Sequence, residues 1–170
     1  STVEIFEPGE AGFDYAQLVR LVQDRISFVP RYRQRIQVVP GRIANPVWVD
    51  DQEFDLDYHV RRSALPRPGT DDQLHELVAR VMSRPLDRAR PLWEMYLVEG
   101  LSGDRFAVLS KTHHAVVDGV SAVDIGAVIL DDTPEPRETL PVEWQPAPEP
   151  GWHALVAGAL AETVRRPRSL

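Results

Sequence analysis

Two adjacent histidines, His113 and His114, are followed by an aspartate and a glycine, Asp118 and Gly119. An imidazole, with an unperturbed pKa of about 6.5, can accept or release a proton near neutral pH. Held beside a cavity, His114 would act as a general base that takes the proton from a hydroxyl or amine as it attacks an activated acyl group. The spacing puts Asp118 one helical turn or one tight loop from His114, close enough to orient the ring or brace the corner.

The same cluster is also compatible with a metal site or with a purely structural corner. Histidine and aspartate bind metal ions, but neighbouring residues of a strand point to opposite sides, and no convincing third ligand accompanies His113 and His114. We therefore expect no metal. A purely structural role for the corner also remains an alternative, because buried polar side chains usually serve to satisfy hydrogen bonds. An acyl-serine enzyme is disfavoured because the sequence has no Gly-x-Ser-x-Gly motif.

Apolar runs on both sides of the histidines predict a strand, a polar corner and a helix in that order. The strand covers 105–111 and forms a hairpin with a strand at 95–98, because the residues between them are typical of a turn. The helix runs from Asp118 to about residue 130 and is apolar almost all round, so we expect it to be buried on more than one side. A carboxylate at its start complements the helix dipole, which would be a structural role for Asp118.

The rest of the chain alternates strand patterns with amphipathic helix patterns. Further strands are predicted at 2–6, 37–39, 46–49 and 54–60, the last as a half-buried strand or an extended loop. Helices are predicted from Asp14 to Pro30, from the capping box that begins at Thr70, and from Trp152 to Val164. The segment 83–94 contains two Arg-Pro pairs and is predicted to be an ordered loop.

Composition narrows the possible functions. The chain has 170 residues, a net charge of −7 and no cysteine. The acidic balance gives no sign of nucleic-acid binding, and the lack of cysteine excludes disulfides, thiolate zinc sites and a cysteine nucleophile. No signal peptide is visible, and no run of about 18 apolar residues could span a bilayer.

A proline-rich segment suggests how the chain is organised. We assign 1–131 to a domain that carries the histidines and 132–150, with six prolines, to a linker. Residues 151–170 form an amphipathic helix with a basic end, for which packing on a neighbouring domain is favoured over lying on a membrane.

Three further polar features receive a structural interpretation. His59 lies beside an aromatic residue and is expected to be a hydrogen bonder, not a catalyst. His75 falls off the apolar stripe of its helix and is expected to be exposed. The arginines of 31–36 could contact an anionic cofactor, but a solvated edge is favoured.

The sequence around the histidines also carries a family resemblance. Residues 113–119, His-His-Ala-Val-Val-Asp-Gly, resemble the HHxxxDG signature of the CoA-dependent acyltransferase superfamily, which includes chloramphenicol acetyltransferase-like enzymes and the condensation domains of nonribosomal peptide synthetases. Four other stretches are similar to bacterial wax ester synthase/diacylglycerol acyltransferases of the triacylglycerol synthase type, at 31–35, 46–50, 54–60 and 85–94. This similarity covers about residues 3–131 in the right order, which makes it far more specific than the signature alone.

The resemblance implies roles for individual residues. His114 would be the general base that deprotonates the acceptor hydroxyl for direct attack on the acyl-CoA thioester, and His113 would support it. Asp118 would mainly hold the loop, and Gly119 would allow close approach of the backbone. Pro91-Leu92-Trp93 matches a recurrent element of the family that would support the site, with Trp93 packed behind the wall of the active site.

The resemblance further implies an α/β fold, a mixed sheet flanked by helices, which forms the N-terminal half of a chloramphenicol acetyltransferase-like enzyme. Such an enzyme would move a fatty acyl group from acyl-CoA, with no cofactor beyond that substrate, to the hydroxyl of diacylglycerol or a long-chain alcohol. Family members are more than twice as long, so residues 132–170 would lead towards a C-terminal domain. The 170 residues alone are therefore expected to be inactive.

Two other functions stay open. One is a condensation-domain-like, polyketide or mycolipid acyltransferase that uses a carrier-bound acyl donor. The other is a non-catalytic fragment that binds lipid or a partner. In each case we expect a cytoplasmic protein, and water-insoluble products would favour peripheral contact with the inner face of the cell membrane or with lipid droplets.

Overall fold

A four-stranded mixed sheet forms the centre of the protein. The computed structural model describes residues 1–10, 12–117, 125–131 and 144–165. The strands lie in the order β1 (Thr2–Phe6), β6 (Phe106–Thr112), β5 (Trp93–Glu99) and β4 (Val60–Ala64). β6 is antiparallel to both β1 and β5, whereas β4 and β5 are parallel. The predicted mixed sheet and the predicted hairpin of β5 and β6 are therefore confirmed.

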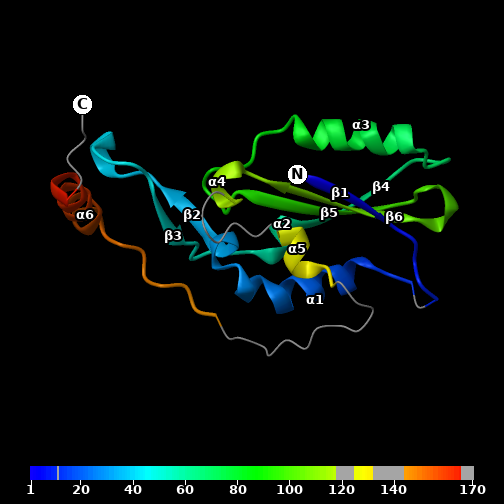
Figure 1. Ribbon diagram of the computed structural model, residues 1–170, viewed down its shortest axis with the longest axis horizontal. Helices are drawn as coiled ribbons and strands as arrows, with labels where there is room; N and C mark the ends of the chain where they lie inside the picture. Colours follow the sequence, from blue (N-terminus) through cyan, green and yellow to red (C-terminus); the bar gives the residue numbers. More distant parts are fainter. Residues whose placement is uncertain (11, 118–124, 132–143, 166–170) are drawn as a thin grey trace.

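Helices cover both faces of this sheet (Figure 1). α3 (Asp71–Met82) lies on one face, while α1 (Tyr15–Arg25) and the short α5 (Ile125–Ile129) lie on the other. Because it is covered on both sides, β5 is buried along all but its last residue. Its side chains alternate between two cores. Those in the core with α1 are Trp93, Met95 and Leu97, and those in the core with α3 are Tyr96 and Val98.

Both of these longer helices begin with a capping box, which the sequence predicts at Thr70 and the structure also shows at Asp14. The side chains of Asp14 and Thr70 each accept a hydrogen bond from the backbone N–H of a glutamine three residues later, and that glutamine accepts one from the cap in return. α1 ends earlier than predicted, at Arg25. The chain continues as two 3-10 turns, η1 (Ile26–Phe28) and η2 (Pro30–Arg33), because its next residues form tighter i to i+3 hydrogen bonds.

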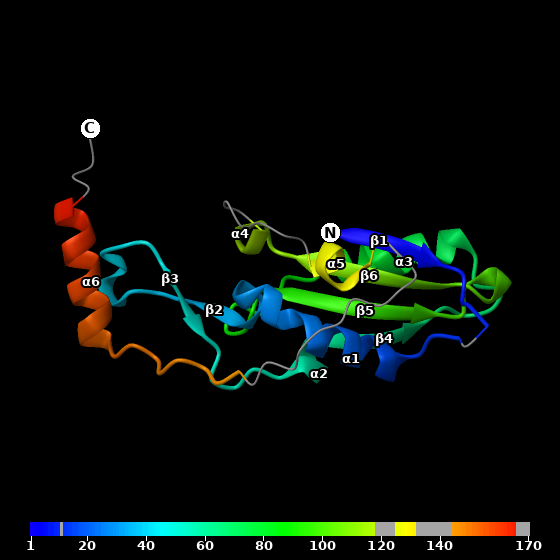
Figure 2. The same cartoon turned by 60° about the horizontal axis from the view of Figure 1, so that its bottom comes forward.

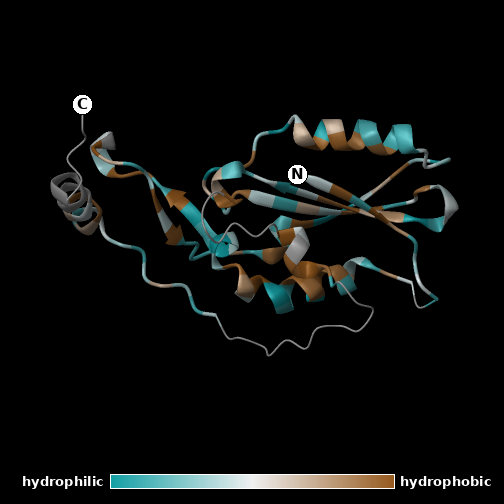
Figure 3. Cartoon of the chain, viewed as in Figure 1, coloured by the Kyte–Doolittle hydropathy of each residue, from teal (hydrophilic) through white to brown (hydrophobic). Residues whose placement is uncertain are grey.

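Lys111, the only lysine in the sequence, ties α3 to β6. The apolar side of α3 faces the sheet (Figure 3), and the side chain of Lys111 is buried beneath the C-terminal end of the helix. Its Nζ donates hydrogen bonds to the backbone carbonyls of Val81, at 2.8 Å, and Arg84. These bonds tie the C-terminal end of α3 to β6, and a cation there also interacts favourably with the helix dipole.

A two-stranded arm projects from the sheet domain (Figures 1 and 2). It consists of β2 (Gln34–Gln37) and β3 (Val47–Asp50), and α6 (Trp152–Arg165) packs across its far end. Leu155 of α6 is buried against Val39. The helix predicted near the end of the chain is thus confirmed. The strand predicted at 37–39 is displaced, because pairing with β3 covers only the residues of β2.

The segment 54–60 is not the strand or extended loop that its alternation predicts. Leu56–His59 forms a helical turn, α2, and β4 begins only after it. The carboxylate of Asp55 accepts a hydrogen bond from the backbone N–H of Asp57 at 3.0 Å and so starts the turn. A local N-cap here overrides the period-2 pattern.

Two predicted elements fall partly outside the described residues. The helix predicted from Asp118 is described only from the start of α5, so Asp118 and Gly119 have no assigned position. Residues 132–143 of the predicted linker also lie outside. The remaining linker residues, 144–150, form neither helix nor strand.

Candidate active site

The two histidines follow directly on the end of β6. The last residue of this strand, Thr112, pairs with Trp93 at the start of β5. The backbone N–H of His113 donates a hydrogen bond of 3.0 Å to the carbonyl of Leu92. The corner and the buried Pro91-Leu92-Trp93 element therefore lie side by side.

His113 holds the corner in shape. Its Nδ1 accepts a hydrogen bond from the backbone N–H of Ala115 at 3.1 Å, and its carbonyl accepts one from Val116 at 2.9 Å. With Nδ1 accepting, the neutral ring carries its proton on Nε2. These bonds start the single helical turn α4 (His114–Val117).

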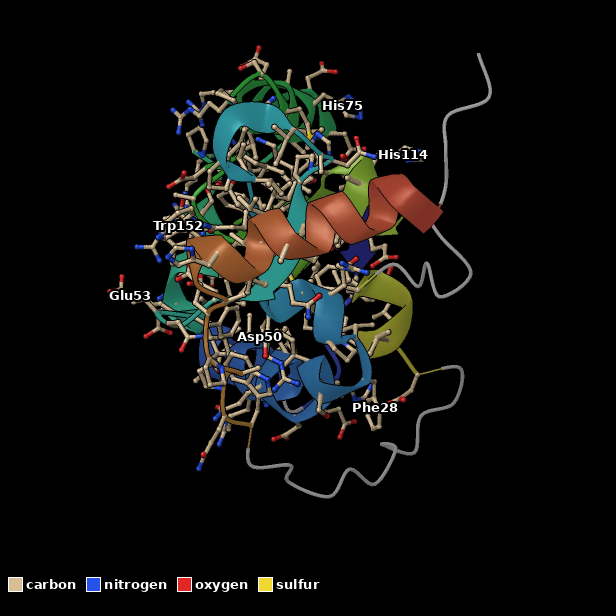
Figure 4. All side chains as sticks on the ribbon, turned by 90° about the vertical axis from the view of Figure 1, so that its left-hand side faces the viewer. Phe28, Asp50, Glu53, His75, His114 and Trp152 are labelled. Carbon is tan, nitrogen blue, oxygen red and sulfur yellow. The ribbon has the colours of Figure 1, made fainter. Side chains whose placement is uncertain are left out.

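His114 is the first residue of that turn and is exposed, at the surface of the molecule in Figure 4. The structure gives its ring no hydrogen bond or ion pair with any residue of the described ranges. An imidazole with free nitrogens in such a place can take a proton from a bound hydroxyl. The position of Asp118 relative to this ring stays a prediction, as does the close approach at Gly119.

The argument that strand alternation separates the histidines does not hold. Both His113 and His114 lie beyond the last residue of β6, so they do not alternate across a sheet. Within the described part of the chain, no group of three histidine, aspartate or glutamate side chains is placed to hold a metal ion.

Aromatic side chains form a wall behind the corner. The indole N–H of Trp93 donates to the carbonyl of Tyr32 at 2.7 Å, and the two rings meet edge to face at 5.6 Å. The hydroxyl of Tyr32 in turn accepts from the backbone N–H of Ile125 at 3.0 Å. The fully buried Trp93 and its partner Tyr32 thus connect η2, β5 and α5.

His59 belongs to this wall and not to the corner. Its ring is fully buried and stacks between Trp93, at 4.6 Å, and Phe54, at 5.3 Å. Its Nδ1 lies 2.8 Å from the carbonyl of Trp93, which requires the proton on Nδ1 because a carbonyl only accepts. Burial lowers the pKa of His59. The predicted structural role of His59 agrees with this environment, and His75 is exposed as predicted.

The arginines of 31–36 do not all lie on a solvated edge. Arg33 is buried, and its guanidinium lies over the ring of Trp144, 4.4 Å from the ring centroid. Arg35 forms an ion pair of 2.9 Å with Glu149. Both partners come from residues 144–150, more than 100 positions away in the chain, so local sequence patterns carry no sign of them.

Comparison with known proteins decides the family. The wax ester synthase/diacylglycerol acyltransferase catalytic domain matches residues 1–170, the whole chain. The chain belongs to this family. The resemblance in the sequence is thereby confirmed, and with it the expected class of enzyme domain.

Mycobacterial proteins are among the relatives of this chain. The probable diacylglycerol O-acyltransferase tgs3 of Mycobacterium tuberculosis is 50% identical over 157 residues, which cover 92% of this chain and 58% of that protein. The probable diacylglycerol O-acyltransferase tgs1 of the same organism is 46% identical over 125 residues, covering 74% of this chain and 27% of the relative. The chain therefore spans little more than half the length of the first relative and about a quarter of the second.

Solved structures show the same fold. The wax ester synthase/diacylglycerol acyltransferase from Marinobacter aquaeolei VT8 superposes with a TM-score of 0.58 at 38% identity, over 71% of this chain and 30% of that one. The first condensation domain of the calcium-dependent antibiotic synthetase gives a TM-score of 0.54 at 17% identity, over 69% and 27% of the two chains. At that identity the likeness concerns the fold alone. The expected chloramphenicol acetyltransferase-like architecture is confirmed.

Proposed function

We propose that this chain is the part of an O-acyltransferase that carries the general base, His114. The complete enzyme moves a fatty acyl group from acyl-CoA to the hydroxyl of diacylglycerol or a long-chain alcohol and gives triacylglycerol or wax ester. The support is the family match over the whole chain together with an exposed imidazole at the position of the signature's second histidine. The names of the relatives favour diacylglycerol as the acceptor.

The chemistry proceeds without an acyl-enzyme. A free nitrogen of His114 takes the proton of the acceptor hydroxyl while the oxygen attacks the thioester carbonyl. The tetrahedral intermediate then expels the CoA thiolate, which takes the proton from the imidazolium. A positioned base of this kind contributes about 10²- to 10⁴-fold in rate.

The other corner residues position this base. The hydrogen bonds of His113 to Leu92 and Ala115 fix the backbone from which the ring of His114 extends. Asp118 holds the following loop, and Gly119 lets substrate approach the backbone. Pre-organisation of this kind matters because a displacement of about 1 Å can cost about 10²-fold in rate.

The wider setting of the enzyme forms part of the same proposal. Acyl-CoA serves as substrate with no additional cofactor and no metal, and a C-terminal domain of the same protein completes the site. The protein works in the cytoplasm, with peripheral contact to the inner face of the membrane or to lipid droplets, where its water-insoluble substrates collect. Among the described residues, no helix is both long and apolar enough to cross a bilayer.

The decisive test is His114→Ala in the full-length protein, assayed with palmitoyl-CoA and either diacylglycerol or hexadecanol. We expect kcat to fall by at least about 10²-fold while circular dichroism and thermal unfolding stay as in the wild type. His75→Ala is the matched control, because His75 is an exposed histidine on α3 and not part of the corner. A His114→Ala protein that keeps its activity, or one that simply unfolds, would show that the corner is structural.

The same assay separates the other candidate functions. Ester formed from palmitoyl-CoA identifies the donor, and the product extracted from each acceptor shows which alcohol is preferred. Turnover with a carrier-bound acyl group but not with acyl-CoA would assign the protein to condensation-like chemistry. No turnover with any donor would leave a lipid- or partner-binding domain.

A further inference from the structure

Arg33 carries a buried charge that has no ion-pair partner within the described ranges. The residue is 8% exposed, and no carboxylate of those ranges lies within ion-pair distance of its guanidinium. Its Nε is buried and has no hydrogen-bond partner there either. Burial lowers the pKa of Arg33, although the guanidinium remains charged. Leaving such a charge uncompensated destabilises a folded protein, so its retention requires a physical reason.

The guanidinium borders a cavity of about 420 Å³. This volume is within the usual range for small-molecule sites, about 300–1,000 Å³. Its apolar wall consists of Val19, Ile26, Phe54 and Leu56. Gln23, Asp55 and Asp57 add polar residues to the lining, and Trp144 completes it beside Arg33. The cavity therefore offers one cation, an apolar surface and a cluster of hydrogen-bond acceptors.

The guanidinium of Arg33 still has N–H groups with which it can bind an anion. Its face is taken up by the ring of Trp144, 4.4 Å away, but stacking does not use the N–H groups at its edge. Asp50 acts electrostatically on Arg33 but forms no ion pair with it, and its two oxygens accept hydrogen bonds from Gln34 and from the backbone of Ala147. A planar fork of N–H donors matches the two oxygens of a carboxylate or phosphate.

We propose that this cavity is a binding site for a small organic anion with at least one hydroxyl or amino group. The carboxylate or phosphate pairs with Arg33, the carbon skeleton lies against Phe54 and Leu56, and the hydroxyl or amino group donates to Asp55 or Asp57. The two aspartates disfavour ligands that carry only negative charge, which is why a donor group belongs to the ligand. Neither corner histidine lines this cavity. Asp50, which acts electrostatically on Arg33, is well separated from His114 in Figure 4.

The test is calorimetric titration of the full-length protein at constant ionic strength with glycerol 3-phosphate, 3-hydroxybutyrate, inorganic phosphate and acetate. We expect saturable binding of at least one of the two hydroxylated anions, tighter than binding of its simple counterpart. Arg33→Gln should weaken that binding by roughly 10- to 100-fold, the usual range for loss of a hydrogen bond to a charged group. Arg35→Gln is the matched control, because Arg35 is already paired with Glu149 and does not border the cavity.

Further variants keep the result interpretable. Val19→Trp fills the cavity without touching the charge and should abolish binding, which covers the case in which Arg33→Gln folds poorly. His114→Ala should leave binding unchanged, so failure of the proposed acyl transfer would not affect this outcome. The proposal is overturned if no probe binds the wild type, as when a carboxylate from elsewhere in a longer protein fills the cavity. It is equally overturned if Arg33→Gln and Val19→Trp bind as well as the wild type.

Discussion

His59 and His114 are chemically identical side chains in opposite surroundings. His59 is stacked between aromatic rings with one nitrogen bonded to the carbonyl of Trp93, and its Nε2 is buried without a partner among the described residues. His114 is exposed, and no described residue forms a hydrogen bond with either nitrogen of its ring. A base must be reachable by the proton it takes, so exposure and not residue type separates the catalytic candidate from the structural ring.

The buried ring predicts an acid-sensitive stability. Burial lowers the pKa of folded His59 below its unfolded value near 6.5, with Arg90 and Arg61 adding to the effect and the Trp93 carbonyl and Asp51 opposing it. The unfolded state therefore binds more protons as the pH falls. The contribution of neutral His59 to the free energy of unfolding is therefore fully present above about pH 6.5. It falls below that pH by up to about 1.4 kcal/mol per pH unit.

Denaturant unfolding between pH 7.5 and pH 5 checks this prediction. His59→Asn keeps an N–H donor for the Trp93 carbonyl but does not titrate, so its free energy of unfolding should depend less steeply on pH than that of the wild type. His75→Asn, at an exposed site, should keep the wild-type slope. Equal slopes in all three proteins would mean that His59 does not titrate differently on folding.

At the scale of elements, the active-site corner depends on what holds β6. The strand is paired on both sides, by β1 and β5, and Lys111 anchors its end to the last turn of α3. The histidines follow two residues later. Because the strand cannot shift without breaking these contacts, the backbone that carries His114 is fixed on three sides.

Lys111→Met should therefore destabilise the protein and leave the corner less well fixed. The variant keeps an apolar stem but removes the charged donor to the Val81 and Arg84 carbonyls, which we expect to cost about 1.5–3 kcal/mol in the free energy of unfolding. Arg80→Met is the control, because Arg80 is exposed near the same helix end. Urea titration of both variants checks the prediction, and equal losses would remove the special role of Lys111.

At the scale of the whole molecule, the described chain is a sheet domain with a projecting arm. His114 lies at the surface, where nothing in the described residues encloses a substrate. Acyl transfer requires that water be kept from the thioester and that charge on the oxyanion be stabilised. The chain spans only part of the length of its relatives, and the proposed function assigns this enclosure to the C-terminal domain.

Residues 1–170 alone should accordingly fold but show no acyl transfer. Product extraction and thin-layer chromatography after incubation with palmitoyl-CoA and diacylglycerol would detect turnover. The full-length protein, assayed in parallel, provides the positive control. Triacylglycerol formed by the 170 residues alone would show that the site is complete within them.

Local sequence rules determined the elements whose signals lie within a few residues. The capping box at Thr70, the hairpin of β5 and β6 and the HHxxxDG signature are all contacts or patterns of short range, and the structure contains this cap and this hairpin. Where two short-range signals competed, as at 54–60, the N-cap of Asp55 prevailed over alternation. Which signal prevails depends on how the following residues pack in the folded protein, and the alternation of hydrophobic residues carries no information about that packing.

Only the tertiary structure decided the order of the strands, the stacking of His59 on Trp93 and the burial of Arg33 beneath Trp144. These contacts join residues 34 and 111 positions apart. Burial of apolar surface is not directional, so a sequence shows which side chains must leave water but not which distant ones they meet. Sequence patterns place Arg33 on a solvated edge for this reason, since the tryptophan that covers it lies at the other end of the chain.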